Sequence, residues 1–399
     1  MRVRADSKFQ GGPACGLAMA VWLSLGLTAW AQPVPGTKGG TGTLGLRAGE
    51  KLKPERIEEI YRRVLADWSA GETERAPDEL IELESAVVSD ADAGTRKVLL
   101  KSEQAVIHQV GAADLEVLVP IAVLHHEAYR RLLQRGFQGH ALAMIHTRTM
   151  ARDLAILYNE QSGSEGAGLV SSRLLTSLGG LLQQSAQQLP AAEMFQQAVE
   201  LDGKNIAALL GLATIYEKNA QTETAVKFLR RAIEAEPGNP EARLRLALNL
   251  KRLDQKTEAR KLLQELTVAT EASWVTPLAF QELAQLHVEG GEGGGLEDAE
   301  KVLQQALKRF PNDLRLHIQL AAVLDRRGHP GEATVLVENA LSLPAGQEAS
   351  ARFLYNSVRP DAFAAARTFL DENSRSRLPV LAQALGAPPP QAAGTGVGR

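Results

Sequence analysis

Cysteine, aromatic residues and an excess of one charge are all scarce in this sequence. Cys15 is the only cysteine among 399 residues, aromatic residues make up 5%, and the formal net charge is −3. A single cysteine near the start excludes a disulfide framework, a thiolate metal site and a cysteine nucleophile in the rest of the chain. Without a broad basic excess the chain cannot neutralise a phosphate backbone, so we do not expect nucleic acid as a partner.

Long apolar runs are also missing, apart from one at the start. Three basic residues within the first eight positions precede an apolar run over residues 14–29, and small residues stand at Ala29 and Ala31. This pattern predicts a signal peptide over residues 1–31 and therefore an exported chain, periplasmic or secreted. The alternative is a retained membrane anchor. No later segment is apolar for long enough to span a membrane, so we expect no span after cleavage.

Motifs of nucleotide-binding and hydrolytic sites are absent as well. No P-loop, dinucleotide fingerprint, nucleophile elbow or Asp-rich calcium loop occurs in the sequence. The Gly-rich segment 290–295 lacks the lysine that a phosphate-binding loop requires. We therefore predict a protein that is not an enzyme and has no catalytic, cofactor-binding or metal-binding residues.

The densest group of candidate metal ligands comprises His125, His126, Glu127, His140 and His146. A zinc-binding helix usually places two histidines at positions i and i+4, on one face. His125 and His126 are adjacent, and His140 and His146 are six residues apart, so each pair diverges on a helix. We expect these histidines on helix surfaces or in the packing of helical hairpins, with Glu127 paired to a following arginine. A hydrolase with a site in residues 50–160 is left as an alternative.

Segments without apolar patterning lie near both ends of the chain. Glycine, proline and threonine dominate residues 32–50, a predicted flexible linker, and residues 387–399 are a predicted disordered tail. Between them apolar residues recur at helical spacing, without strand-like alternation, so we predict an all-α fold. Residues 51–165 are expected to form degenerate helical hairpins, and residues 348–386 a degenerate repeat or a cap. Two helices are expected in this last segment, at 351–358 and 361–372.

A repeat of 34 residues is the strongest pattern in the chain. Leu178, Leu212 and Leu246 lie 34 residues apart, and a small residue follows each of them. Alanines repeat at the same interval, at Ala191, Ala225 and Ala259. Small residues let two helices approach closely, and a proline such as Pro237 ends the second helix of a unit.

This pattern resembles the tetratricopeptide-repeat family, whose unit is a pair of antiparallel helices. The resemblance covers residues 172–347 and implies an α-solenoid of antiparallel helical hairpins, the tetratricopeptide-type superhelix. Five repeats are predicted, at 172–205, 206–239, 240–273, 277–313 and 314–347. Whether the N-terminal helical region is a separate domain is left open.

The resemblance implies binding, because the first helices of such repeats line a concave groove. We predict an adaptor that binds a peptide or helix of a partner protein there, in a cell-envelope or secretion complex. The alternative is a chaperone-like or stabilising subunit of an exported enzyme, and homo-oligomerisation is left open. The helical phase predicts these groove residues: Arg173, Thr176, Gln183, Gln184, Leu210, Glu217, Lys218, Leu244, Lys251, Arg252, Arg315, Asp325 and Arg326.

The chemistry of the predicted groove separates two binding modes. Some members of the family hold a carboxylate at the end of a partner chain with a lysine and an asparagine, and no such pair stands at the comparable positions here. Leu210, Leu244, Leu248 and Ile318 instead predict a partly apolar groove. Such a groove suits an amphipathic helix or a hydrophobic peptide segment.

Overall fold

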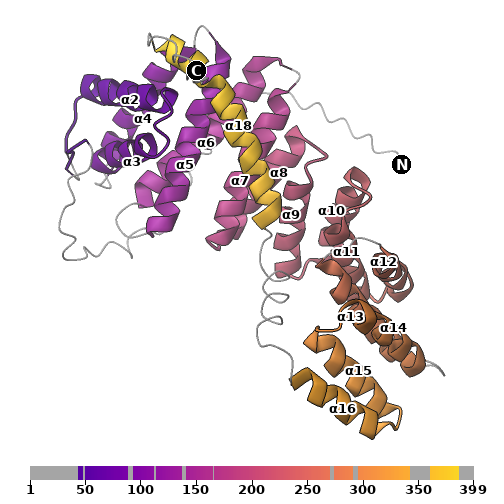
Figure 1. The fold of residues 1–399 in the computed structure, drawn as a ribbon. Coiled ribbons are helices and arrows are strands. Elements are labelled where there is room, and N and C mark those ends of the chain that lie inside the picture. Colours follow the sequence, from indigo (N-terminus) through magenta and orange to yellow (C-terminus); the bar gives the residue numbers. More distant parts are fainter. Residues whose placement is uncertain are drawn as a thin grey trace, which may run out of the picture. The chain divides into compact units, whose positions relative to one another are not determined.

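Every element of the described chain is a helix (Figure 1). The computed structural model describes residues 44–47, 50–88, 93–111, 114–136, 141–164, 166–269, 274–290, 295–341 and 360–385. The all-α prediction is confirmed, since these ranges contain no strand. The predicted signal peptide, most of the linker and the C-terminal tail lie outside them. Among the described helices, none combines the length and the apolar character that crossing a membrane requires.

The N-terminal region contains five α-helices and one short 3-10 helix. They are α2 (Pro54–Ser69), α3 (Arg75–Val87), α4 (Ala93–Gly111), η2 (Leu115–Val117), α5 (Leu118–Arg135) and α6 (Ala141–Ser162). Pro120 lies in the first turn of α5, where its missing N–H leaves no hydrogen bond unmade, so it does not kink the helix. The indole Nε1 of Trp68 donates to the carbonyl oxygen of Pro120 at 2.9 Å and joins α2 to α5.

Five consecutive helix pairs follow. They are α7 (Ala167–Gln184) with α8 (Gln188–Leu201), α9 (Ile206–Lys218) with α10 (Thr222–Ala235), α11 (Pro240–Arg252) with α12 (Lys256–Val268), α13 (Val275–Glu289) with α14 (Gly295–Arg309), and α15 (Leu314–Arg326) with α16 (Pro330–Leu341). Each helix packs against the next one along the chain. The described part of the chain is therefore an α-solenoid, as predicted.

The turns inside four of these pairs share one backbone feature. Ala186, Ala220 and Asp254 have φ angles of 59°, 56° and 58°, and Gly328 takes the corresponding place in the last pair with φ 86°. A left-handed residue ends the first helix and reverses the chain. The three non-glycine residues are 34 residues apart, so the repeat extends to the backbone of the turn.

The last described helix, α18 (Pro360–Ala384), returns to the N-terminal half of the chain. It extends beyond residue 372, where we expected a helix to end, while the expected helix at 351–358 lies outside the described residues. Its main partners are α7 and α5, and it also contacts α2, η2 and α9 (Figure 1). Leu370 and Leu381 of α18 are buried in the same core as α2 to α13. A second apolar cluster joins α13 to α16.

Candidate functional site

The predicted groove residues lie on the first helices of four pairs, α7, α9, α11 and α15. Four of these residues are buried: Thr176, Gln183, Leu210 and Leu244. The Thr176 hydroxyl donates to the Ser172 carbonyl oxygen at 2.8 Å and accepts from Asn205 Nδ2 at 2.8 Å. The prediction that these four residues line the groove is wrong, because they pack against neighbouring helices. A ligand cannot reach them without displacing those helices.

Two further predicted groove residues connect adjacent repeats. Glu217 of α9 accepts from Arg245 Nη2 at 2.8 Å and from Asn249 Nδ2 at 2.6 Å, both on α11. Lys251 Nζ lies 3.1 Å from Glu282 Oε2 of α13. We call these five residues the inter-repeat ladder. It fixes one first helix against the next, so Glu217 and Lys251 have a structural partner before any ligand binds.

The sequence analysis did not identify Arg245, Asn249 or Glu282. Arg245 also donates to the Thr214 hydroxyl at 2.9 Å and to the Leu210 carbonyl oxygen at 3.2 Å. A signal was present, because the opposite charges of Glu217 and Arg245 stand on the first helices of consecutive repeats. The position of a residue around one helix does not show which face of that helix meets the next helix. The packing of the two helices decides which residues meet.

The other predicted groove residues are accessible to different degrees. Those exposed are Gln184, Lys218, Arg252, Asp325 and Arg326, while Arg315 is half-buried. The Arg173 guanidinium lies 5.9 Å from the ring centroid of Phe369, so α18 already occupies its surroundings. Of the four expected apolar groove residues, Leu248 is half-buried and Ile318 of α15 is 50% exposed.

Helix α18 covers part of the first-helix face with residues of the chain itself. Arg377 forms an ion pair with Glu116 of η2, and its Nη2 lies 3.5 Å from the hydroxyl of Tyr158. Phe369 lies against Arg173, and α18 reaches as far as α9. The first-helix face of α7 and α9 therefore accommodates a helix, whose Phe369 meets Arg173 of α7 while its Arg377 meets η2 and α6.

The histidines that the sequence singled out are buried in helix packing. His125 Nε2 lies 2.9 Å from the Tyr61 hydroxyl, and His126 Nε2 lies 2.8 Å from Ser177 Oγ, so the adjacent histidines diverge as expected. His146 Nε2 lies 2.6 Å from Glu103 Oε2. His140 lies outside the described residues.

Glu127 differs from its histidine neighbours. It accepts from Arg130 Nε at 2.8 Å, which is the expected pairing with a following arginine.

Burial, followed by the charge of Glu103, raises the pKa of Glu84 well above its usual value. Burial, followed by the charge of His146, lowers the pKa of His125 to about 3. A substrate has no access to these fully buried groups, so they do not support the hydrolase alternative.

Comparison with known proteins supports the repeat architecture. Residues 206–249 and residues 241–268 each match a sequence profile described as tetratricopeptide repeat. No curated protein sequence matches the chain.

Several solved structures are similar to parts of the chain. The MamA protein is 18% identical with a TM-score of 0.37, and the match covers 43% of this chain and 90% of MamA. YrrB, described as a TPR protein with an unusual peptide-binding site, is 16% identical with a TM-score of 0.35, over 49% of this chain and 91% of YrrB. PilF of Pseudomonas aeruginosa is 17% identical with a TM-score of 0.38, and the match covers 54% of this chain and 91% of PilF. TM-scores this low carry no weight for function. The two matching profiles show that the chain contains tetratricopeptide repeats over residues 206–268, within a solenoid of five helix pairs.

Proposed function

We propose that this protein is a non-catalytic adaptor that binds a helix or an extended peptide of a partner protein on the first-helix face of α11, α13 and α15. Solenoids of helical repeats expose long continuous surfaces, and protein recognition is their usual role. The observation that carries the proposal is α18, which packs against α7 and α9, the first helices of two pairs, and against α5. A face that holds one helix of the chain itself has the chemistry to hold another from a partner.

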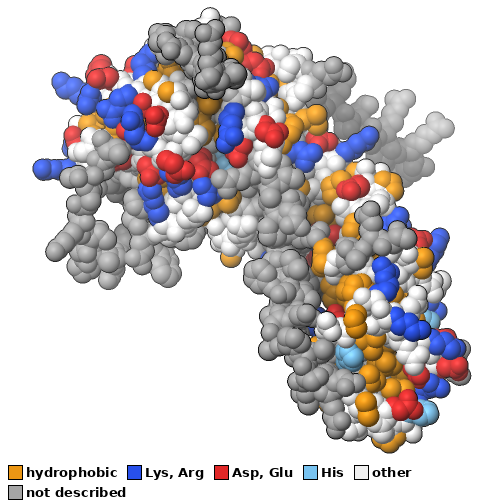
Figure 2. Space-filling view, viewed as in Figure 1, with side chains coloured by type: hydrophobic (Ala, Val, Ile, Leu, Met, Phe, Trp, Pro, Cys, Tyr) orange, Lys and Arg blue, Asp and Glu red, His pale blue; other side chains and the backbone are white. Residues whose placement is uncertain are grey.

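The part of the face beyond α9 supports this binding mode. Ile318 of α15 is 50% exposed, and Asp325 and Arg326 are exposed at the end of the same helix. Hydrophobic side chains gather over the region of α13 to α16, with charges of both signs around them (Figure 2). An amphipathic helix with apolar anchors and mixed charges is complementary to such a surface.

The proposed setting is a cell-envelope or secretion complex outside the cytoplasm. It is supported only by the signal-peptide pattern of residues 1–31. Mass spectrometry of the chain expressed in a bacterium with a periplasm tests it directly. Export with cleavage after Ala31 gives a mature chain that starts at Gln32, whereas an intact N-terminus on a cytoplasmic protein contradicts the proposal.

Partner capture with matched variants tests the binding surface. The tagged chain serves as bait in an envelope extract, beside Ile318→Asp and the triple variant Lys218→Glu, Arg252→Glu and Arg326→Glu. Val335→Asp is the control, because Val335 is 54% exposed but lies on the second helix of the same pair. We expect a partner that is retained by the wild type and by the control, and lost with Ile318→Asp. Equal retention by all variants would move binding away from this face.

A further inference from the structure

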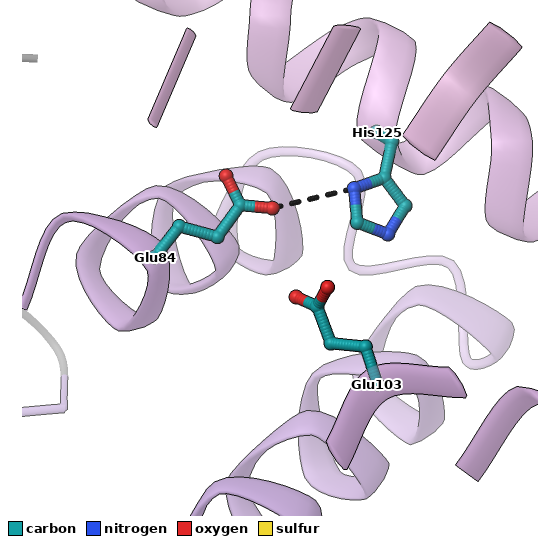
Figure 3. Close-up of side chains that lie close together, drawn as sticks. All are labelled: Glu84, Glu103 and His125. Atoms are coloured by element: carbon teal, nitrogen blue, oxygen red, sulfur yellow. Dashed lines mark ion pairs between the residues drawn. The ribbon is translucent and has the colours of Figure 1, made fainter. Parts of the chain in front are cut away.

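Three side chains with metal-binding groups converge inside the N-terminal helices. Glu84 comes from α3, Glu103 from α4 and His125 from α5, and Figure 3 shows all three pointing toward one another. Each offers one ligand atom, and these atoms all lie within 4.8 Å of one another. All three residues are 0% exposed, so bulk water does not solvate their polar atoms.

The facing atoms have no hydrogen-bond partner among the described residues. This holds for both carboxylate oxygens of Glu84, for Oε1 of Glu103 and for Nδ1 of His125. His125 Nδ1 lies 3.3 Å from Glu84 Oε1. Buried polar atoms are nearly always hydrogen-bonded or ligated, so four such atoms in one place point to a ligand that they share.

The charge of the cluster indicates that this ligand is a cation. Within the part of the chain that the structure describes, neither Glu84 nor Glu103 forms an ion pair with a lysine or an arginine, and both pair only with histidines. A buried carboxylate requires a compensating charge or a proton. Two carboxylates and a neutral imidazole together match the charge of one divalent metal ion.

The ligand types and distances favour zinc among the divalent ions. Zinc takes carboxylate oxygens and imidazole nitrogens at about 2.1 Å, which places two ligands of a tetrahedral site about 3.4 Å apart. His125 Nδ1 and Glu84 Oε1 are 3.3 Å apart, which is close to that value, and the three ligand atoms would draw together from within 4.8 Å of one another. Because neither oxygen of Glu84 has a hydrogen-bond partner, this carboxylate can bind the ion through both oxygens and supply a fourth donor atom.

The outer partners of the cluster hold its ligands in suitable orientations. The Tyr61 hydroxyl lies 2.9 Å from His125 Nε2, which leaves Nδ1 to face the carboxylates. His146 Nε2 lies 2.6 Å from Glu103 Oε2, which leaves Oε1 for a ligand. Metal-binding histidines usually donate their second ring N–H to such a partner, and the carboxylate ligands are themselves hydrogen-bonded.

We propose that Glu84, Glu103 and His125 bind one divalent transition-metal ion, with zinc as the first candidate, and that this ion joins α3, α4 and α5. The complete burial of the ligands makes it a structural ion, because a catalytic ion needs an open position for substrate. The proposal is independent of the adaptor function. It differs from the sequence-based expectation that the chain has no metal-binding residues.

Metal titration of the full chain tests the proposal. The purified protein is stripped with a chelator, dialysed and titrated with Zn²⁺ in competition with a chromophoric chelator, and Co²⁺ is then added to read the visible spectrum of the bound ion. We expect one equivalent of metal and a higher melting temperature with zinc. Glu84→Gln and His125→Asn should lose both the stoichiometric binding and the zinc-dependent shift. Tyr61→Phe should keep one equivalent and bind it roughly 10- to 100-fold more weakly.

Two matched variants separate metal binding from general damage to the fold. Glu79→Gln removes a buried carboxylate from the same helix, α3. Unlike Glu84, Glu79 forms ion pairs with Arg63 and Arg75. His126→Asn removes the neighbouring buried histidine. Both controls should bind one equivalent, with helical content checked by circular dichroism.

Two results would overturn the proposal. One is a folded wild type that binds none of Zn²⁺, Co²⁺, Mn²⁺ and Fe²⁺ stoichiometrically. The other is stoichiometric binding that Glu84→Gln and His125→Asn leave unchanged. If either variant fails to fold, the wild-type stoichiometry and cobalt spectrum decide the matter.

Discussion

The contact between Phe195 and two glycines gives the sharpest prediction about the fold. Phe195 of α8 is fully buried, and its ring lies between Gly179 of α7 and Gly211 of α9. A Cβ atom added to Gly211 would lie 2.7 Å from both Cε2 and Cζ of the ring, and one added to Gly179 would lie 2.7 Å from Cε1. Separations below about 3 Å between such carbon atoms are repulsive, so the ring has no free side toward which it can move.

Two effects of Gly211→Ala oppose each other. Alanine is favoured over glycine inside a helix by about 1 kcal/mol. Overpacking a close-packed interior costs about 1–3 kcal/mol, and the glycine on the other side of the ring keeps that cost at the upper end. We therefore expect Gly211→Ala to lower the free energy of unfolding by about 1–2 kcal/mol, the difference of these two contributions.

Urea unfolding followed by circular dichroism measures this change. The control is Gly331→Ala, because an added Cβ there meets nothing within 4 Å. The control should match or exceed the wild-type stability. In a Phe195→Leu background, Gly211→Ala should become neutral or stabilising, since a smaller side chain relieves the clash. A Gly211→Ala protein that is as stable as the wild type would refute the packing argument.

Two further predictions concern the turns and the inter-repeat ladder. Ala220 has a φ of 56°, a conformation that costs an alanine roughly 1–2 kcal/mol, so Ala220→Gly should raise the free energy of unfolding by about 0.5 kcal/mol after the entropy of glycine is subtracted. A lower urea midpoint for this variant would contradict the assignment of that turn. Arg245→Ala leaves Glu217 and Thr214 without their shared donor and should cost about 1–2 kcal/mol. Arg245→Lys should recover only part of this loss, because an ammonium group does not span both acceptors, and full recovery in urea unfolding would show that charge alone suffices.

Local sequence patterns predicted the helix pairs because the interactions that form them are close in the chain. Ala225 is buried, and its recurrence after 34 residues marks the neighbouring pairs. The same patterns misplaced Thr176 and Leu244, which are buried. Helical phase shows which side chains share a face, but it does not show how closely the next helix covers that face.

The sequence by itself determined the all-α class, the period of the repeat and its tetratricopeptide pattern, because each depends on residues within one or two adjacent hairpins. Only the tertiary structure decided where α18 lies, since Arg377 meets Glu116 across 261 residues of chain. It also decided the candidate metal site. Glu84, Glu103 and His125 stand on three different helices without motif spacing, and only the packing of those helices brings their side chains together.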